Sequence, residues 1–153
     1  MNCVGIDASL TGTGLVIIDK SCEVLFEELI SSSSKDDIES RLIDISDRIF
    51  SKIEKYKDLT ICIEGLSFGS RGQATLDLAG LHFYLRTILF RDKYLFYVIP
   101  PTTLKRYVTG GGQCQKNLML LKCYKKFGVE FSNDNLCDAY CLARYGLENY
   151  MGK

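Results

Sequence analysis

The sequence contains no tryptophan, two prolines and a single histidine among its 153 residues. With His82 as the only imidazole, a structural zinc site is disfavoured. Long hydrophobic runs are also missing: the longest, such as residues 15–18 and 95–101, are far shorter than a membrane span. The N-terminus lacks a basic segment followed by an apolar one, so no secretory signal is visible. We therefore expect a cytoplasmic protein that does not act at a membrane.

Cysteines are numerous but lack the spacing of a metal or redox motif. Their number is odd, and no CxxC pair occurs among Cys3, Cys22, Cys62, Cys114, Cys123, Cys137 and Cys141. In a cytoplasmic chain this favours reduced, mostly buried thiols. Cys137 and Cys141 are four residues apart in an expected helix, and zinc would need further ligands there.

The chain has no net charge, but its charges are segregated. Residues 1–64 carry 7 basic and 13 acidic residues, residues 65–127 carry 10 and 2, and residues 128–153 carry 2 and 4. A basic middle segment can bind a polyanion on one face while the whole chain stays neutral. A lysine-rich surface that is merely solvated remains the alternative on charge alone.

Apolar, β-branched segments alternate with helical periodicities along the chain. Strands are expected at residues 3–7, 14–19, 23–29, 59–63 and 94–99, and helices at 36–53, 74–91, 103–107, 114–127 and 135–150. The first three strands are separated by short turns, which favours an antiparallel meander. This order predicts an α/β protein with a five-stranded mixed sheet flanked by helices, in one domain over residues 1–153.

Two acidic residues end expected strands. Asp7 follows the first strand and Glu64 follows the fourth. If those strands are parallel neighbours, both side chains emerge at the same edge of the sheet, and a strand end is a rigid base for a metal ligand. For Asp7, the alternative is a hairpin in which the carboxylate only caps a turn.

Two further aspartates lie on the last expected helix. Asp134 and Asp138 are four residues apart and therefore share a face. Asp134 could also serve as an N-cap. Asp138 lies among apolar residues, where burying a lone carboxylate is costly. A carboxylate cluster around Mg²⁺ or Mn²⁺ is the simplest arrangement that neutralises it.

Four motifs in this order resemble the RuvC family of Holliday-junction resolvases, within the ribonuclease H-like superfamily and closest to its small phage-type members. The resemblance spans residues 2–147. It rests on Gly5-Ile6-Asp7-x-Ser9-x-x-x-Thr13-Gly14, on Ile63-Glu64, on Leu104-Lys105 through Lys116, and on Asp134-x-x-x-Asp138-Ala139. A phage-encoded member would work in the cytoplasm of its host.

The resemblance implies that Asp7, Glu64 and Asp138 are catalytic metal ligands. A fourth acidic group is expected three residues before the last aspartate, which is Asn135 here, while Asp134 is four before it. We favour Asp134 and keep Asn135 as the alternative. Two Mg²⁺ or Mn²⁺ ions, about 4 Å apart, would activate water and stabilise the leaving 3′ oxygen. The products of such hydrolysis carry 5′-phosphate ends.

The resemblance also gives the basic middle segment a role. Lys105 and Lys116 match two family lysines around the glycine-rich turn, and Lys116 is expected to act at the scissile phosphate. Arg71 and Arg106, with Lys122, Lys125 and Lys126, are expected to contact backbone phosphates further out. Phe68 matches an aromatic residue that stacks on unpaired bases, or else anchors its loop to the core.

The helix expected at 74–91 is apolar nearly all round, which suggests burial on two sides. The family is homodimeric through this helix, and two-fold symmetry suits a junction that needs two symmetric cuts. His82 is interpreted as a core or interface residue and not as a base.

Three other functions remain open from the sequence. A nuclease of the same superfamily could act on other branched DNA or on RNA. An ATPase of the actin and sugar-kinase type has a similar loop after its first strand, but needs two such domains. A non-catalytic DNA-binding module would not need the four acidic residues Asp7, Glu64, Asp134 and Asp138. The base preference of cleavage depends on contacts in the complex.

Overall fold

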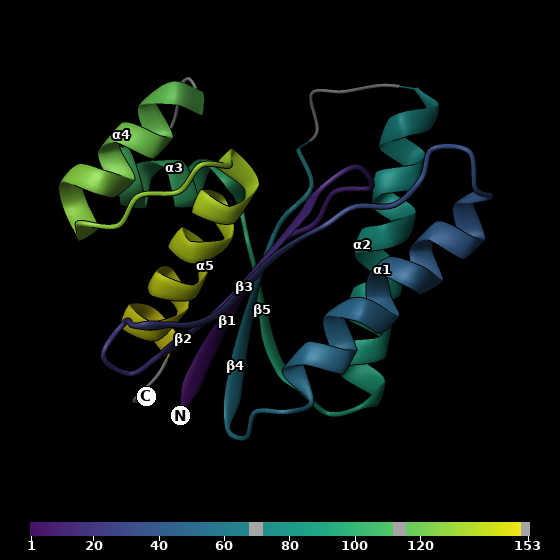
Figure 1. Ribbon diagram of the computed structural model, residues 1–153, viewed down its shortest axis with the longest axis horizontal. Coiled ribbons are helices and arrows are strands. Elements are labelled where there is room, and N and C mark those ends of the chain that lie inside the picture. The colour runs from purple at the N-terminus through teal and green to yellow at the C-terminus, as the bar shows by residue number, and fades with distance from the viewer. Residues whose placement is uncertain (68–71, 112–115, 151–153) are drawn as a thin grey trace.

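Five strands form one mixed sheet through the middle of the computed structural model, with helices on both faces (Figure 1). The structure describes residues 1–67, 72–111 and 116–150. The strand order is β3-β2-β1-β4-β5. The strands are β1 (Asn2–Asp7), β2 (Thr13–Asp19), β3 (Val24–Ile30), β4 (Leu59–Glu64) and β5 (Leu95–Ile99).

The sheet has the predicted mixed topology. β1, β2 and β3 form an antiparallel meander, whereas β4 pairs in parallel with β1 and β5 pairs in parallel with β4. β1 is the central strand, and its residues from Cys3 onward are buried. A strand covered on both faces is apolar at successive positions, as the run before Asp7 is.

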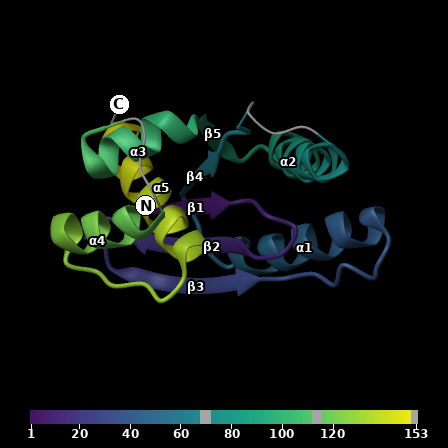
Figure 2. The same ribbon diagram turned by 90° about the horizontal axis from the view of Figure 1, so that it is seen from above.

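Two helices cover one face of the sheet and three lie on the other, an arrangement that can be followed in Figures 1 and 2. The first pair is α1 (Ile38–Ile53) and α2 (Gln73–Arg91); the others are α3 (Pro101–Thr109), α4 (Lys116–Phe127) and α5 (Asp134–Tyr150). Each predicted helix and strand is present, with ends that differ by at most two residues. Across the described residues, none of the helices combines the length and apolarity that crossing a membrane requires.

Each face of the sheet has its own apolar core. On one side, Ile45, Ile49 and Ile53 lie four residues apart on α1 and pack with α2 against the sheet. This spacing gives the helix a single apolar stripe. On the other side, α5 packs with α3 and α4 against the opposite faces of the same central strands.

The contact between α5 and the sheet depends on two glycines. A Cβ atom at Gly5 of β1 would overlap the backbone carbonyl of Ala139, and one at Gly14 of β2 would overlap the backbone of Asn135. Without side chains at these two positions, the helix lies directly on the strand backbones. Both glycines belong to expected strands and to the first motif, but the sequence gives no sign of this contact with a helix.

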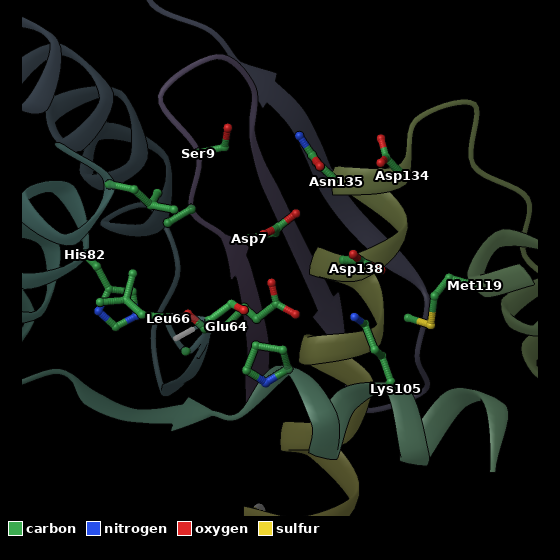
Figure 3. A pocket seen from close by; sticks show the side chains of 15 residues that line it. Asp7, Ser9, Glu64, Leu66, His82, Lys105, Met119, Asp134, Asn135 and Asp138 are labelled. Carbon is green, nitrogen blue, oxygen red and sulfur yellow. Dashed lines mark hydrogen bonds between the residues drawn. The ribbon is translucent and has the colours of Figure 1, made fainter. Parts of the chain in front are cut away.

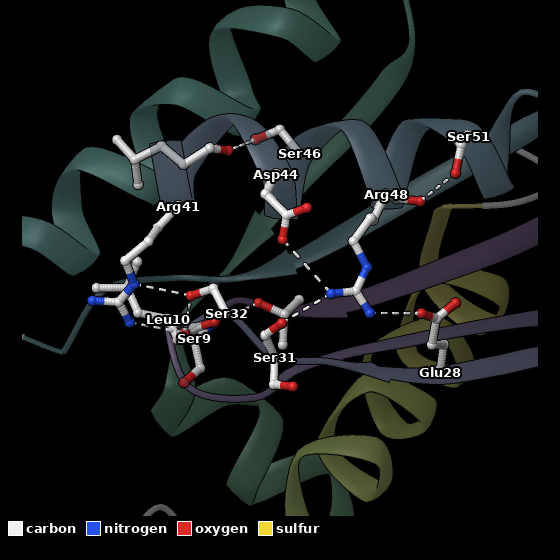
Figure 4. Close-up of polar contacts among 12 residues, drawn as sticks. Ser9, Leu10, Glu28, Ser31, Ser32, Arg41, Asp44, Ser46, Arg48 and Ser51 are labelled. Carbon is white, nitrogen blue, oxygen red and sulfur yellow. Dashed lines mark hydrogen bonds and ion pairs between the residues drawn. The ribbon is translucent and has the colours of Figure 1, made fainter. Parts of the chain in front are cut away.

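Two arginines tie α1 to the turns at the edge of the sheet (Figure 4). Arg41 donates hydrogen bonds to the Ser32 hydroxyl (2.9 Å) and to the Leu10 carbonyl oxygen (3.1 Å). Arg48 pairs with Glu28 of β3 at 3.0 Å and donates to the Ser31 carbonyl oxygen at 2.9 Å. The charged face of α1 therefore not only faces solvent but also holds neighbouring segments of the chain.

We expect Gly5→Ala to destabilise the protein by more than about 3 kcal/mol, because Ala139 belongs to helix backbone that cannot yield locally. Gly80→Ala is the matched control, since its new methyl group meets only the Leu42 side chain at 3.6 Å. In the interior of α2 that change should stabilise by about 0.5–1 kcal/mol. Chemical denaturation measures both, and equal effects would contradict the close packing of α5.

The Glu28 ion pair makes stability depend on pH. Burial alone would raise the pKa of Glu28, but hydrogen bonds from Arg48 and Lys52 outweigh it and lower that pKa. A lowered folded-state pKa adds stability above the unfolded value, and this stability is lost as the pH falls through the folded value.

Glu28→Gln should therefore cost about 0.5 kcal/mol at pH 7, a cost that disappears in acid below the normal glutamate range. Urea denaturation between pH 7 and pH 3 measures it. Glu27→Gln, on the opposite face of β3, is the matched control. The same pH dependence in both variants would argue against the ion pair.

Candidate active site

The parallel pairing of β1 and β4 brings two carboxylates together at one edge of the sheet. Ile6 lies opposite Ile63 in this pairing, and the next residues along the two strands are Asp7 and Glu64. Both strands end there, at their carboxyl ends. The arrangement expected for these two residues from the sequence is therefore present.

The turn after β1 is closed by hydroxyl groups. The Thr13 hydroxyl donates to the Ser9 carbonyl oxygen at 2.6 Å and accepts from the Ser9 backbone N–H at 3.0 Å. Asp7 is 9% exposed and lines a cleft beside this turn. The Thr13 side chain thus makes both of these bonds, and the Ser9 hydroxyl accepts another from the Thr11 backbone N–H at 3.3 Å.

The first turn of α5 supplies the other acidic groups. The Asn133 side-chain oxygen accepts hydrogen bonds from the backbone N–H groups of Asn135 (2.9 Å) and Leu136 (3.2 Å). Asn133 therefore performs the N-cap role that the sequence left open for Asp134. Asp134 is the first residue of the helix, and Asp138 lies one turn further on.

Asn135 fastens α5 to the turn between β1 and β2. Its Nδ2 donates to the Gly12 carbonyl oxygen at 2.5 Å. Because a carbonyl oxygen only accepts, the amide nitrogen must face Gly12, which leaves the amide oxygen on the other side of the group. Both Asp134 and Asn135 line the same cleft, so the identity of the fourth active-site group stays a prediction.

The cleft encloses about 290 Å³ and is lined by residues of β1, β4, α2, α3, α4 and α5 and of the segments that follow β1 and β4. Figure 3 shows the carboxylates of Asp7, Glu64 and Asp138 turned toward one space, with the Lys105 side chain approaching from α3. Asp134 and Asn135 lie nearer the N-terminus of α5. Several carboxylates in a cleft repel one another unless cations neutralise them. An all-oxygen donor set of this kind fits Mg²⁺ or Mn²⁺.

The predicted DNA-contacting residues fall in different places. Lys105 lines the cleft, whereas Arg106 is exposed and lines a separate hollow with Tyr145 and Glu148. Lys116 begins α4, but its side chain lies outside the described part of the structure, as do Phe68 and Arg71 altogether.

Lys126 has a structural contact that the sequence did not reveal. Its ammonium group donates to the Tyr107 carbonyl oxygen at 2.5 Å and lies 3.8 Å from the centre of the Tyr107 ring. The side chain therefore joins α4 to α3. Lys122 and Lys125 lie on the same helix and remain candidates for distal phosphate contacts.

The sequence predicted the burial of His82 but not its place beside the cleft. His82 is 2% exposed, as expected for a core residue, but it also lines the cleft. Its Nε2–H donates to the Glu64 carbonyl oxygen at 2.9 Å. Burial lowers the pKa of His82 more than this hydrogen bond raises it, and the nearby charge of Arg86 lowers it further. The imidazole is therefore neutral and holds the end of β4. A lone histidine in an apolar helix gave no sign of this contact.

Known proteins share both the sequence pattern and the fold. The family model described as crossover junction endodeoxyribonuclease RuvC matches residues 3–143. The RuvC of Prochlorococcus marinus (strain NATL2A) is 27% identical over 152 residues, covering 96% of this chain and 98% of the relative. The RuvC of Rickettsia bellii (strain RML369-C) is 26% identical over 148 residues, covering 94% of each.

Solved structures give the same result for the fold. Thermus thermophilus RuvC in complex with a Holliday junction superposes with a TM-score of 0.79 at 19% identity, covering 94% of this chain and 90% of the other. The fowlpox virus resolvase, solved with its Holliday junction substrate, gives 0.63 at 11% identity and 99% coverage of both chains. These similarities confirm the ribonuclease H-like fold expected from the sequence.

The match to the family model covers most of the chain, including β1, β4 and the part of α5 that carries the carboxylates. RuvC nucleases depend on metal ions, which agrees with the oxygen-rich cleft. The chain therefore belongs to the crossover junction endodeoxyribonuclease RuvC family.

Proposed function

We propose that this protein is a structure-selective endonuclease that resolves four-way DNA junctions by paired, metal-dependent hydrolysis of phosphodiester bonds. The observation that carries the proposal is the meeting of Asp7, Glu64 and Asp138 from three elements in one cleft beside Lys105. The chain belongs to a family of that activity, and a relative of the same fold has been solved with a Holliday junction. The whole of residues 1–153 would act as one nuclease domain.

The carboxylates of Asp7, Glu64 and Asp138, with Asp134 as the fourth, would hold two Mg²⁺ or Mn²⁺ ions. When bound, such ions activate water for attack on phosphorus and neutralise charge on the leaving 3′ oxygen. In-line attack leaves 5′-phosphate and 3′-hydroxyl ends.

The rigidity of the protein supports this chemistry. Asp7 and Glu64 extend from paired strands, so their backbones are fixed by the sheet, and His82 holds the carbonyl group of Glu64. Asp138 is fixed by the close packing of α5. Groups held on regular elements keep their positions better than groups on loops. The Lys105 ammonium group, which lines the cleft, would attract the phosphate of the substrate.

Other basic residues would guide the DNA. Lys116 is proposed to act close to the scissile phosphate, and Arg71 and Arg106 to bind backbone phosphates further away. Phe68 would stack on unpaired bases at the crossover. Electrostatic binding of this kind should weaken as salt concentration rises.

A homodimer would place two such clefts on one junction. α2 exposes several large apolar side chains, with Leu76, Phe83 and Phe90 exposed by 66%, 56% and 80%. Burying them against a second copy would remove apolar surface from water. An interface with two-fold symmetry presents two active sites that are also related by two-fold symmetry.

Asp7→Asn and Glu64→Gln should each reduce cleavage of a four-way junction by about 10³-fold or more while leaving binding near normal, because each removes a negative ligand and keeps the shape. Cleavage and gel-shift assays with Mg²⁺ measure the two effects. Asp47→Asn, on the exposed side of α1, is the control and should cleave normally.

Wild-type cleavage persisting in both site variants would rule out the proposed centre. The substrate is tested with the same protein on four-way junctions, flaps, duplexes and RNA–DNA hybrids. Equal rates on all of these would contradict junction selectivity and favour a more general nuclease.

Asp134→Asn and Asn135→Ala separate the two candidates for the fourth group. Asp134→Asn should lower cleavage about tenfold or more and change the melting temperature little, because the hydrogen bonds that cap α5 come from Asn133. Asn135→Ala loses the hydrogen bond to Gly12, which is worth about 1 kcal/mol, so the melting temperature should fall by about 2–4 °C. Normal cleavage by Asp134→Asn together with a large loss in Asn135→Ala would assign the role to Asn135.

A further inference from the structure

Three cysteine side chains gather between α4 and α5. Cys123 belongs to α4, and Cys137 and Cys141 belong to α5. All three are at most 1% exposed, and their sulfur atoms lie within 4.8 Å of one another. The sulfur atoms of Cys123 and Cys141 are 3.6 Å apart. Cys137 and Cys141 reach the same side of α5 because they are one helical turn apart.

The sulfur positions fit a common metal ion. A thiolate binds a soft metal at about 2.3 Å, so three thiolates on one ion are separated by roughly 3.8–4.0 Å in trigonal or tetrahedral geometry. Small adjustments of side chains would bring the three sulfur atoms to these distances. Since soft cations prefer sulfur and Mg²⁺ prefers oxygen, the two sites would select different metals.

We propose that Cys123, Cys137 and Cys141 form a binding site for one soft, thiophilic cation, separate from the catalytic centre. Binding would release the thiol protons to solvent as three sulfur–metal bonds form, with no change in the oxidation state of sulfur. Within the described residues the cluster has three protein ligands. Three buried sulfur atoms favour a cation that is stable with three sulfur ligands, or one that also binds a small external ligand.

A nearby positive charge offsets the charge of such a site. Three thiolates and a divalent cation leave one negative charge, which is costly to bury alone. Arg144 follows Cys141 by one turn of α5, its side chain is 20% exposed, and it shares its charge with Glu148, which lies 3.3 Å away. The guanidinium group stacks on the Phe127 ring, with the carbon 4.6 Å from the ring centre. Its Nε has no hydrogen-bond partner in the described part of the chain, and its charge acts on Cys123.

A bound cation would join two helices that matter for the active site. Cys137 immediately precedes Asp138 on α5, and α4, which carries Cys123, begins at Lys116. The metal would therefore hold the helix of the proposed phosphate-binding lysine against the helix of a proposed ligand. The expected result is higher thermal stability of the loaded protein, by the linkage of binding to folding.

Cd²⁺ is a suitable probe because thiolate-to-cadmium charge transfer absorbs in the ultraviolet, whereas carboxylate binding gives no such band. The full-length, reduced protein is titrated in excess Mg²⁺, which occupies the carboxylates. We expect one Cd²⁺ per chain with the intensity of three thiolates, and a higher melting temperature. Cys123→Ser and Cys141→Ser should each weaken Cd²⁺ binding by about tenfold or more.

Cys22→Ser is the matched control, because Cys22 is half-buried and outside the cluster; it should bind Cd²⁺ like the unmodified protein. X-ray absorption of the unmodified, cadmium-loaded protein gives a measurement that does not depend on variants folding, and should find three sulfur neighbours. A missing band, fewer than three sulfur neighbours, or full binding in Cys123→Ser would overturn the proposal. So would a Cys123–Cys141 disulfide, with no retained metal, in protein prepared without reductant.

Discussion

The direct contact of α5 with the backbones of β1 and β2 is the constraint on which the rest of the structure depends. Gly5 and Gly14 remove the side chains that would separate helix from sheet. Asp138 can therefore lie beside the strand ends that carry Asp7 and Glu64 (Figure 3). An ordinary helix–sheet distance would move Asp138 away from the strand carboxylates. The geometry of the site is thus set by two positions that have no functional group at all.

Much of the fold was accessible from the sequence because its signals are local. Apolar segments of strand length and the four-residue spacing of Ile45, Ile49 and Ile53 follow from the periods of strands and helices. The residues Asp7, Glu64 and Asp138 stand in motifs that directly follow or occupy these elements.

The contacts that the sequence did not predict join residues that are distant in sequence. His82 to Glu64, Arg48 to Glu28 and Cys123 to Cys141 depend on packing between elements, for which one sequence carries no periodic signal. Capping by Asn133 rather than Asp134 reflects a shift of one residue, within the usual uncertainty of helix ends.

The acidic and basic parts of the sequence form different elements of the fold. The acidic N-terminal part supplies β1 to β4 and α1, including two of the cleft carboxylates, and the basic middle part supplies β5, α2, α3 and α4. Not every lysine of that part is available to a polyanion, since Lys126 binds the Tyr107 carbonyl group. Lys105 instead lines the cleft itself. The cleft therefore contains both a basic group that attracts phosphate and carboxylates that repel one another. This combination suits a site where cations and a nucleic acid bind together.

The turn between β1 and β2 borders the cleft and is held from both faces of the sheet. Arg41 of α1 binds its Leu10 carbonyl group, and Asn135 of α5 binds its Gly12 carbonyl group. Such a turn loses its conformational entropy when the protein folds and not when a substrate arrives. The free energy of substrate binding then need not be used to order this wall of the cleft, and a larger share remains for distinguishing one DNA shape from another.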